Sequence, residues 1–541
     1  MSFASIPLVT LLACGLAEPS PRPSLAVVVV FDQLRARDLD RLEPLFGPGG
    51  FGGLAQRNLA HYDAEYGYAA TETGPGHATV ATGASPTVHG IASNAWPTPA
   101  GRAYVVGDPE SPVLFRDDGS GASAKHLLVP TLSDTLRMET NGKAKVVAFS
   151  IKDRGAILLG GRSANLAVWY EPSIGRFTTS KTYGAALPAW LEPLATALPA
   201  DARKNGRWSP LPAPRGKDAL LPVDDRAGEA PRHGFTRVFP HDLASLKDED
   251  ARAAYRGSPQ AMDDLFTLAL RAVENEKLGA DDVPDALFIS MSVTDFVGHW
   301  HGPASLEYVD MLRRADTALR GFLSALDARV GRSRYVFALT ADHGVTQLPE
   351  ATKETGRWGR RIAVEPLEKK LTELARATAP SAGEVLVHPP HVFVDDTNLT
   401  PADRDRVIDA LHGALGATEG IAHVYRADRI ASDLDPFTPA YREILVPGRS
   451  GQLFLRQEPR AVFTWGTDEG TDHGTPYAYD KRVPLLLVGA DVRRGRYAQS
   501  VDVRDLAPTL AFLLAISPPD AAQGKPVDAV GSEGSLPLLG R

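Results

Sequence analysis

The chain has 541 residues, of which 43% are hydrophobic, and it carries a formal net charge of −8 at pH 7. This composition is typical of a globular protein, and the length suits an α/β enzyme with insertions around one core. The acidic balance and the lack of a long basic stretch argue against a protein that binds nucleic acid by neutralising phosphates, so no nucleic acid is expected as a specific partner. The negative net charge does not exclude small phosphorylated substrates, because a metal site supplies local positive charge.

The N-terminal residues resemble an export signal. Residues 6–13 form an apolar run far shorter than the roughly 18 residues of a membrane span, and Leu-Leu-Ala-Cys14, with the only cysteine, resembles a bacterial lipobox. We expect residues 1–24 to be a signal peptide or lipoprotein signal with a Pro- and Ser-rich linker. The protein would then be exported, periplasmic or lipid-anchored to the envelope of a bacterium through Cys14. Against a lipoprotein signal, the apolar run is short and no Lys or Arg precedes it, so a misassigned start codon and an ordinary signal peptide are the alternatives.

The elements of the main domain follow from apolar patterning. Apolar runs predict buried strands at residues 26–31, 146–150, 286–291, 336–341 and 483–488. Such continuous runs are typical of a parallel sheet that is covered on both faces. Apolar residues at helical spacing predict helices at 304–328, 403–415 and 505–515. Because strand and helix signals alternate along the chain, the predicted fold class is α/β.

Two segments interrupt this alternation. Residues 160–245 are rich in Pro, Gly, Trp and Arg, and residues 347–470 mix helix and strand signals. We interpret both as insertions over the ligand crevice, where they would set substrate specificity. The catalytic domain is accordingly predicted to span residues 25–530, with residues 531–541 as a C-terminal tail.

Potential metal ligands follow several of the predicted strands. Asp32 follows the first strand, Asp295 and His299 follow the strand at 286–291, and Asp342-His343 follows the strand at 336–341. In open α/β sheets the ligand site lies outside the carboxyl ends of the strands, so these side chains are expected in one crevice. Asp295 and His299 are four residues apart, which places them on one face of a helix.

A further candidate, His473, lies between glycines that allow close backbone approach. The full set has three carboxylates and three imidazoles: Asp32, Asp295, His299, Asp342, His343 and His473. Mixed nitrogen and oxygen ligands suit Zn²⁺, and six are too many for one tetrahedral ion. The set therefore predicts two Zn²⁺ ions, an arrangement that serves in-line phosphoryl displacement. Taken singly, each Asp can be a helix N-cap and each His a structural residue, but the joint pattern favours metal.

A nucleophile and a phosphate clamp are also indicated. Thr73 precedes Pro75, which suits a first helical turn, so Thr73 lies near a helix N-terminus that favours anions. A metal-bound hydroxyl there would be a strong nucleophile, although the local sequence equally permits a simple N-cap. Asn94 could donate to a phosphate oxygen. Lys152 and Arg154 follow the strand at 146–150, where cations can hold phosphate oxygens, although each of the three could also be an ordinary loop residue.

Together these motifs resemble the alkaline phosphatase superfamily. The segments Thr73-Gly-Pro-Gly-His77, Thr82-Gly83 and His89-Gly-Ile-Ala-Ser-Asn94 are similar to the signature of its threonine-nucleophile branch. That branch contains the nucleotide pyrophosphatase/phosphodiesterases and the phosphate-irrepressible alkaline phosphatases. The second group is the closer match, because Lys152-Asp-Arg154 resembles its Lys-x-Arg motif. The resemblance implies an alkaline-phosphatase-like three-layer sandwich with a mostly parallel central sheet and inserted cap segments.

The resemblance also implies a role for each residue. One Zn²⁺ would be held by Asp295, His299 and His473, and the other by Asp32, Asp342 and His343 together with Thr73. Asn94, Lys152 and Arg154 would bind the transferred phosphoryl group, and in this family the Lys-x-Arg pair marks monoesterases. The implied reaction hydrolyses phosphate monoesters in two in-line steps through a phosphothreonine, with retention at phosphorus.

Two other functions stay open. A phosphodiesterase or nucleotide pyrophosphatase could use the same scaffold, and Lys152 and Arg154 speak against it. A non-catalytic envelope lipoprotein that binds metal or a phosphorylated ligand belongs to a different class. A sulfatase is disfavoured, because no Cys/Ser-x-Pro-x-Arg segment carries its nucleophile. The expected partners are small-molecule phosphate monoesters, and the expected state is a monomer.

Overall fold

The computed structural model describes residues 22–530, apart from residues 100, 354–355, 357–358 and 467–469. Residues 1–21 of the predicted signal and linker, Cys14 among them, and the predicted C-terminal tail at 531–541 lie outside the described residues. Among the helices of the described part, none combines the length and the apolar character that crossing a bilayer requires.

A ten-stranded sheet forms the centre of the main domain, in the order β21-β2-β20-β13-β1-β12-β7-β8-β9, with β22 paired to β2. Its strands are β1 (Leu25–Phe31), β2 (Leu59–Glu65), β7 (Val146–Ser150), β8 (Leu166–Glu171), β9 (Arg176–Thr178), β12 (Asp285–Met291), β13 (Tyr335–Thr340), β20 (Arg482–Val488), β21 (Gly495–Arg496) and β22 (Val501–Asp502). The neighbours β13, β1, β12, β7 and β8 are all parallel. The predicted α/β class with a mostly parallel central sheet is therefore confirmed.

One predicted strand runs in the other direction. The apolar runs at 26–31, 146–150, 286–291 and 336–341 are the parallel strands β1, β7, β12 and β13. The run at 483–488 is β20, which is antiparallel to both of its neighbours, β13 and β2. A strand buried on both faces is continuously apolar in either direction, so the apolar run alone does not reveal its orientation.

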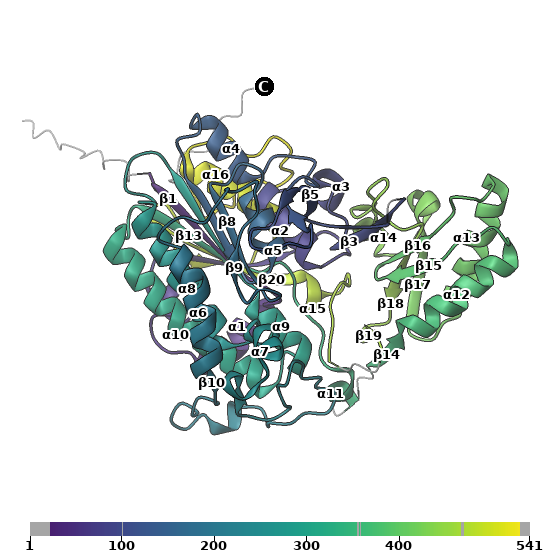
Figure 1. The fold of residues 1–541 in the computed structure, drawn as a ribbon, viewed down its shortest axis with the longest axis horizontal. Coiled ribbons are helices and arrows are strands. Elements are labelled where there is room, and N and C mark those ends of the chain that lie inside the picture. Colours follow the sequence, from purple (N-terminus) through teal and green to yellow (C-terminus); the bar gives the residue numbers. More distant parts are fainter. Residues whose placement is uncertain (1–21, 100, 354–355, 357–358, 467–469, 531–541) are drawn as a thin grey trace, which may run out of the picture.

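Helices cover both faces of this sheet (Figure 1). On one side lie α2 (Thr73–Thr82), α5 (Asp153–Gly160) and α16 (Leu506–Leu514), and on the other lie α6 (Glu192–Asn205), α8 (Pro259–Asn275) and α10 (Leu306–Arg329). The helices predicted at 304–328 and 505–515 correspond to α10 and α16. The sheet is the middle layer, and every residue of β1 is fully buried in it. Burial of each Val or Leu side chain contributes about 1.5–3 kcal/mol, which makes this strand a rigid support for the residues after it.

Residues 347–470 contain a second folding unit with its own hydrophobic core. Its sheet has the order β15-β16-β18-β17 and packs against two helices, α12 (Val364–Thr378) and α13 (Pro401–Gly416). The sheet strands are β15 (Val385–His388), β16 (His391–Val394), β17 (Ile421–Arg426) and β18 (Leu453–Gln457). Figure 1 shows this unit, coloured green, extending from one side of the main domain. The predicted helix at 403–415 is α13.

The segment 160–245 is only partly an insertion. Its first elements, β8 and β9, are strands at one end of the central sheet. The irregular, Pro-rich part begins only after Thr178 and contains α6 and the short strand β10 (Arg207–Trp208). The insertion was predicted to begin near residue 160, and the strands β8 and β9 of the central sheet lie within that predicted range.

Candidate metal centre and phosphate site

The predicted site residues lie at one edge of the central sheet. The strands β13, β1, β12 and β7 are adjacent and parallel, and their last residues are in register, with Phe31 opposite Met291 and Ser290 opposite Ser150. The segments that follow therefore leave the sheet at the same level. Asp295 and His299 lie on α9 (Val293–His301), the helix that follows β12.

All six predicted ligands come together there. The ligand atoms of Asp32, Asp342 and His343 lie within 4.8 Å of one another, as do those of Asp295, His343 and His473. The shortest spacings are 3.2 Å between His299 Nε2 and Asp295 Oδ1 and 3.3 Å between His343 Nε2 and Asp32 Oδ1. Tetrahedral zinc with bonds of about 2.0–2.1 Å requires ligand spacings of about 3.3–3.4 Å. The family resemblance assigns His343 to the ion held by Asp32 and Asp342. In the structure, His343 also lies within 4.8 Å of the ligand atoms of Asp295 and His473.

The three imidazoles are oriented by backbone carbonyls. The Nδ1 atoms of His299, His473 and His343 lie 2.8, 2.7 and 2.9 Å from the carbonyl oxygens of Thr471, Thr71 and Gly344. A carbonyl only accepts, so Nδ1 carries the hydrogen and the lone pair of Nε2 is directed at the carboxylates. This is the tautomer that a metal ligand needs.

Several buried atoms of this centre have no hydrogen-bond partner among the described residues. They are Asp32 Oδ1, Asp342 Oδ2 and His343 Nε2. Leaving a buried carboxylate oxygen without a partner is costly. A cation among these atoms removes that cost, so the residues present fit the two-metal centre that their sequence pattern predicts.

Lys152 lies between the two groups of ligands. Its Nζ donates to Asp32 Oδ2 at 2.7 Å, to Asp295 Oδ2 at 2.6 Å and to Thr73 Oγ1 at 3.2 Å. Burial and Asp295 oppose ionisation of Asp32, but the ammonium of Lys152 helps to hold its pKa below its usual range. The ammonium therefore balances two buried carboxylates and also contacts the candidate nucleophile.

Thr73 is the first residue of α2 and is buried. The N-cap residue of this helix is Glu72, and its own side chain makes no capping hydrogen bond. Thr73 is therefore not the N-cap residue, and its hydroxyl contacts Lys152. Burial opposes ionisation of Glu72, but His388 and the backbone N–H of Asn94 hold its pKa below its usual value.

Arg154 is held by two neighbours that the sequence did not indicate. Its Nη1 donates to the hydroxyl of Tyr104 at 3.2 Å, and that hydroxyl donates to Asp153 Oδ1 at 2.6 Å. Together with Lys152, Arg154 lines a cavity of about 370 Å³. The rest of its lining comprises Arg232, Asp295, Phe296, His299, Trp300, Thr471, Asp472 and residues 462–465 of the second unit. The cavity thus brings cationic, acidic and aromatic side chains together beside the ligand group of Asp295 and His299.

Comparison with known proteins identifies the family. The model described as type I phosphodiesterase / nucleotide pyrophosphatase matches residues 26–476, well over half of the chain. This chain belongs to that family.

The proteins to which this chain is similar have different names. A protein named calcium-transporting ATPase from Myroides odoratus is 30% identical over 525 residues, which cover 94% of this chain and 95% of that protein. Alkaline phosphatase PhoV from Synechococcus elongatus is 30% identical over 514 residues, covering 93% and 92%. The crystal structure of alkaline phosphatase PafA matches with a TM-score of 0.87 at 28% identity, covering 94% of this chain and 99% of that one. The predicted resemblance to the alkaline phosphatase superfamily is confirmed.

Two further residues at the candidate metal centre, Gln33 and Asp472, were not predicted from the sequence. Gln33 donates through Nε2 to Asp295 Oδ1 at 3.0 Å and through its backbone N–H to Asp342 Oδ1 at 3.1 Å. Its backbone has a positive φ of 73°, and its position directly after Asp32 at a strand end was the available signal. Asp472 forms a potential ligand group with His299 and His473. It precedes His473 as Asp342 precedes His343, so the same adjacent Asp-His pattern could have found it.

Proposed function

We propose that this protein is a metal-dependent phosphatase that hydrolyses phosphate monoesters through a covalent intermediate on Thr73. The observation that carries the proposal is the position of Lys152, whose Nζ contacts Thr73 and a carboxylate of each ligand group. A cation at that point can bind an oxygen of a phosphoryl group that Thr73 attacks. The relatives named alkaline phosphatases support the same function.

The two ions are proposed to be Zn²⁺, held by Asp32, Asp342 and His343 and by Asp295, His299 and His473, with Thr73 beside them. When bound, they would supply Lewis-acid stabilisation of the nucleophile, the leaving oxygen and the attacking water. In the second group, the imidazoles of His299 and His473, each oriented by a carbonyl, and the buried Asp295 present preformed ligand atoms, which lowers the cost of binding.

The protein's own groups carry out the transfer. Thr73 Oγ1 attacks phosphorus in line, the ester oxygen departs on the opposite side, and a phosphothreonine forms. Water then attacks the same phosphorus and restores the Thr73 hydroxyl. Throughout, Lys152, Arg154 and the side-chain amide of Asn94 donate to the non-bridging oxygens, where charge develops. Two inversions at one phosphorus give overall retention.

Monoesters are favoured over diesters because of the charge around the reacting group. A monoester presents a dianionic phosphoryl group, and Arg154 provides a guanidinium held by Tyr104. A diester carries one charge fewer and a second substituent that competes for the space near Arg154. The runner-up function is phosphodiester or pyrophosphate hydrolysis, which the description of the matching family names.

The test compares hydrolysis of p-nitrophenyl phosphate with that of bis-p-nitrophenyl phosphate at about pH 8–9, with and without added zinc. We expect a zinc-dependent preference for the monoester of at least about 10²-fold. A diester preference would contradict the monoesterase proposal and favour the runner-up. Thr73→Ala is the control: it should bind as much zinc as the wild-type protein and show almost no turnover with either substrate.

The location of the protein is a separate proposal. Export and lipid attachment at Cys14 rest on the sequence pattern alone, and we expect a monomer without a sequence pattern that indicates it. Mass spectrometry of the mature protein after expression in a bacterium tests the first two. A lipid-modified N-terminal cysteine supports the lipoprotein, and cleavage elsewhere supports an ordinary signal peptide. Gel filtration with light scattering measures the oligomeric state.

A further inference from the structure

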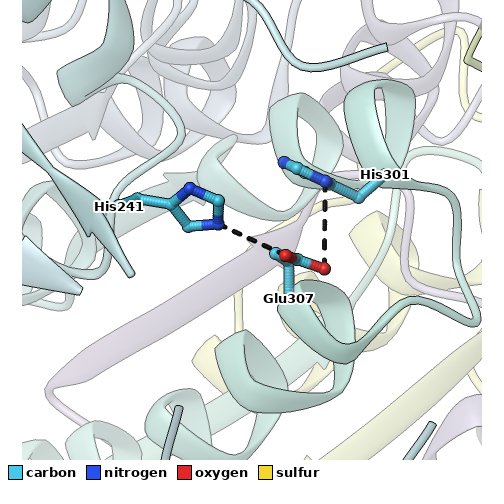
Figure 2. Close-up of side chains that lie close together, drawn as sticks. All are labelled: His241, His301 and Glu307. Carbon is cyan, nitrogen blue, oxygen red and sulfur yellow. Dashed lines mark hydrogen bonds and ion pairs between the residues drawn. The ribbon is translucent and has the colours of Figure 1, made fainter. Parts of the chain in front are cut away.

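A second buried cluster of ligand-type side chains lies apart from the candidate metal centre. Figure 2 shows its members, His241, His301 and Glu307, whose ligand atoms all lie within 4.8 Å of one another. His241 is on β11 (His241–Asp242), His301 ends α9, and Glu307 lies in the first turn of α10. All three side chains are fully buried. Residues two apart on a helix face different directions, so His301 is not directed at the site of His299.

The spacing in this cluster is that of a metal site. His241 Nε2 lies 3.3 Å from Glu307 Oε1, and His301 Nδ1 lies 3.8 Å from Glu307 Oε2. A fourth side chain, Glu229, has its Oε2 3.5 Å from His301 Nδ1 and is also fully buried. Ligands around tetrahedral zinc are about 3.3–3.4 Å apart. The spacings match those at the candidate metal centre, where His343 Nε2 is 3.3 Å from Asp32 and 3.5 Å from Asp342.

The polar atoms of the cluster are largely unsatisfied. Both ring nitrogens of His301, both carboxylate oxygens of Glu229, and Glu307 Oε2 have no hydrogen-bond partner among the described residues. Two carboxylates buried in this way carry a large desolvation cost unless a cation compensates them. We propose that His241, His301, Glu307 and Glu229 bind a divalent cation, Zn²⁺, at a structural site separate from the catalytic centre. Two nitrogen and two oxygen ligands, with both carboxylates balancing the double charge, fit closed tetrahedral zinc.

The proposed cation would link the loop of Glu229 to α9, the helix that carries the metal ligands Asp295 and His299. On either side of Glu229, Ala230 N donates to Trp300 O at 2.7 Å and Gly228 O accepts from Gly470 N at 2.7 Å. The segment that begins at Gly470 leads to His473, and Thr471 N donates to His299 O at 3.1 Å. A cation bound to Glu229 and His301 therefore holds together the end of α9 and the loop of His473. We infer a positioning role for it rather than a catalytic one.

A proton network is the rival account of the same cluster. Burial raises the pKa of Glu229 and of Glu307 to about 7, so protons rather than a cation can neutralise these carboxyls near neutral pH. The two accounts differ in what a carboxyl-to-amide change does. Glutamine resembles a protonated glutamate in shape and neutrality but is a poor zinc ligand. Glu307→Gln is therefore nearly neutral for a proton network and damaging for a metal site.

The first experiment counts zinc in the full-length protein after gel filtration, by elemental mass spectrometry, and measures the melting temperature. Glu307→Gln is expected to lose one zinc per chain relative to wild type and to melt several degrees lower. The matched control is Asp264→Asn, another carboxyl-to-amide change, at a half-buried side chain outside the cluster, which should keep the wild-type zinc content. An unchanged zinc content in folded Glu307→Gln would overturn the proposal and support the proton network.

A second experiment needs no variant of the cluster. Crystals of the zinc-loaded wild-type protein, measured at the zinc absorption edge, should give an anomalous peak among His241, His301 and Glu307. Peaks at Asp32, Asp342 and His343 with none at this cluster would overturn the proposal. The same measurement on Thr73→Ala is expected to show the cluster peak as well. The outcome is thus independent of whether the proposed phosphatase activity is correct.

Discussion

The side-chain oxygen of Asn94 accepts a hydrogen bond from the backbone N–H of Gly74 at 2.8 Å, which joins the proposed phosphate-binding amide to the residue after Thr73. A backbone N–H only donates, so the atom that faces Gly74 is Oδ1, and Nδ2 is left to donate elsewhere. A Cβ on Gly74 would lie 2.9 Å from this oxygen, so only glycine permits the approach without displacement. Glu72 holds the other side of Asn94, accepting from its backbone N–H at 2.9 Å.

Substitutions of Asn94 test this orientation. Asn94→Ala removes the donor, and we expect kcat/KM for a monoester to fall by about 10²-fold. Asn94→Asp keeps an oxygen for Gly74 but replaces the donor by a negative charge beside the phosphoryl group, so its loss should be larger. Steady-state kinetics on zinc-replete protein measure both variants. If Asn94→Asp were as active as Asn94→Ala, the amide would not face the substrate.

Arg154 is expected to act on monoesters more than on diesters, because the dianionic phosphoryl group gains more from a guanidinium. Arg154→Ala should lower kcat/KM for p-nitrophenyl phosphate by about 10²-fold or more and lower it much less for the diester. Tyr104→Phe removes the hydroxyl that accepts from Arg154. It should give a smaller loss, about 3–10-fold, in the same direction, which corresponds to one hydrogen bond. Equal losses on both substrates would argue against a clamp.

Lys152 should influence how strongly zinc stabilises the protein. Without metal, its ammonium neutralises Asp32 and Asp295, whereas bound ions take over that task. Lys152→Met should therefore destabilise the metal-free protein more than the zinc-loaded protein, so that the rise in melting temperature on zinc loading becomes larger than in wild type. Lys125→Met is the control, because Lys125 pairs with Asp108 at 2.8 Å outside this centre. An equal rise in wild type and Lys152→Met would contradict the assignment.

Much of the candidate site could be predicted because its residues directly follow apolar strands. The pattern that buries β1, β12 and β13 also fixes where the chain leaves the sheet, so the sequence alone places Asp32, Asp295 and Asp342 at one edge. The direction of β20 could not be predicted in this way, because both orientations bury the same side chains. Nor could the division of ligands, since His343 reaches both groups.

Contacts between side chains that are distant in sequence could not be predicted from the apolar periodicity. Tyr104 and Arg154 are 50 residues apart, and His241 and Glu307 are 66 apart. Neither pair has a periodicity that links its members, and each forms only when the loops pack against the sheet or its helices. The cluster of His241, His301 and Glu307 could not be predicted for this reason, although His301 lies only two residues after the predicted ligand His299.

Asp264, on α8, allows a test of pH-dependent stability away from the metal ligands. Its Oδ2 accepts from the hydroxyl of Tyr255 at 2.7 Å, and burial raises its pKa to about 7. The folded protein therefore holds this proton more tightly than the unfolded chain, whose Asp pKa is about 3.9. Between these two values the folded state binds more protons, so stability falls as pH rises from about 4 to about 7 and stays lower above it.

Asp264→Asn keeps an acceptor for Tyr255 and removes the charge. We expect the variant to be more stable than wild type at pH 8, by at least about 1 kcal/mol, and to lose that advantage near pH 4. Urea unfolding at several pH values measures the difference between variant and wild type, in which the titration of all other groups cancels. Glu249→Gln, at an exposed carboxyl of α7 (Asp248–Tyr255), is the control, and at pH 8 it should not stabilise the protein as Asp264→Asn does. An Asp264→Asn variant that is less stable than wild type at pH 8 would mean that the Asp264 carboxylate stabilises the fold through its charge.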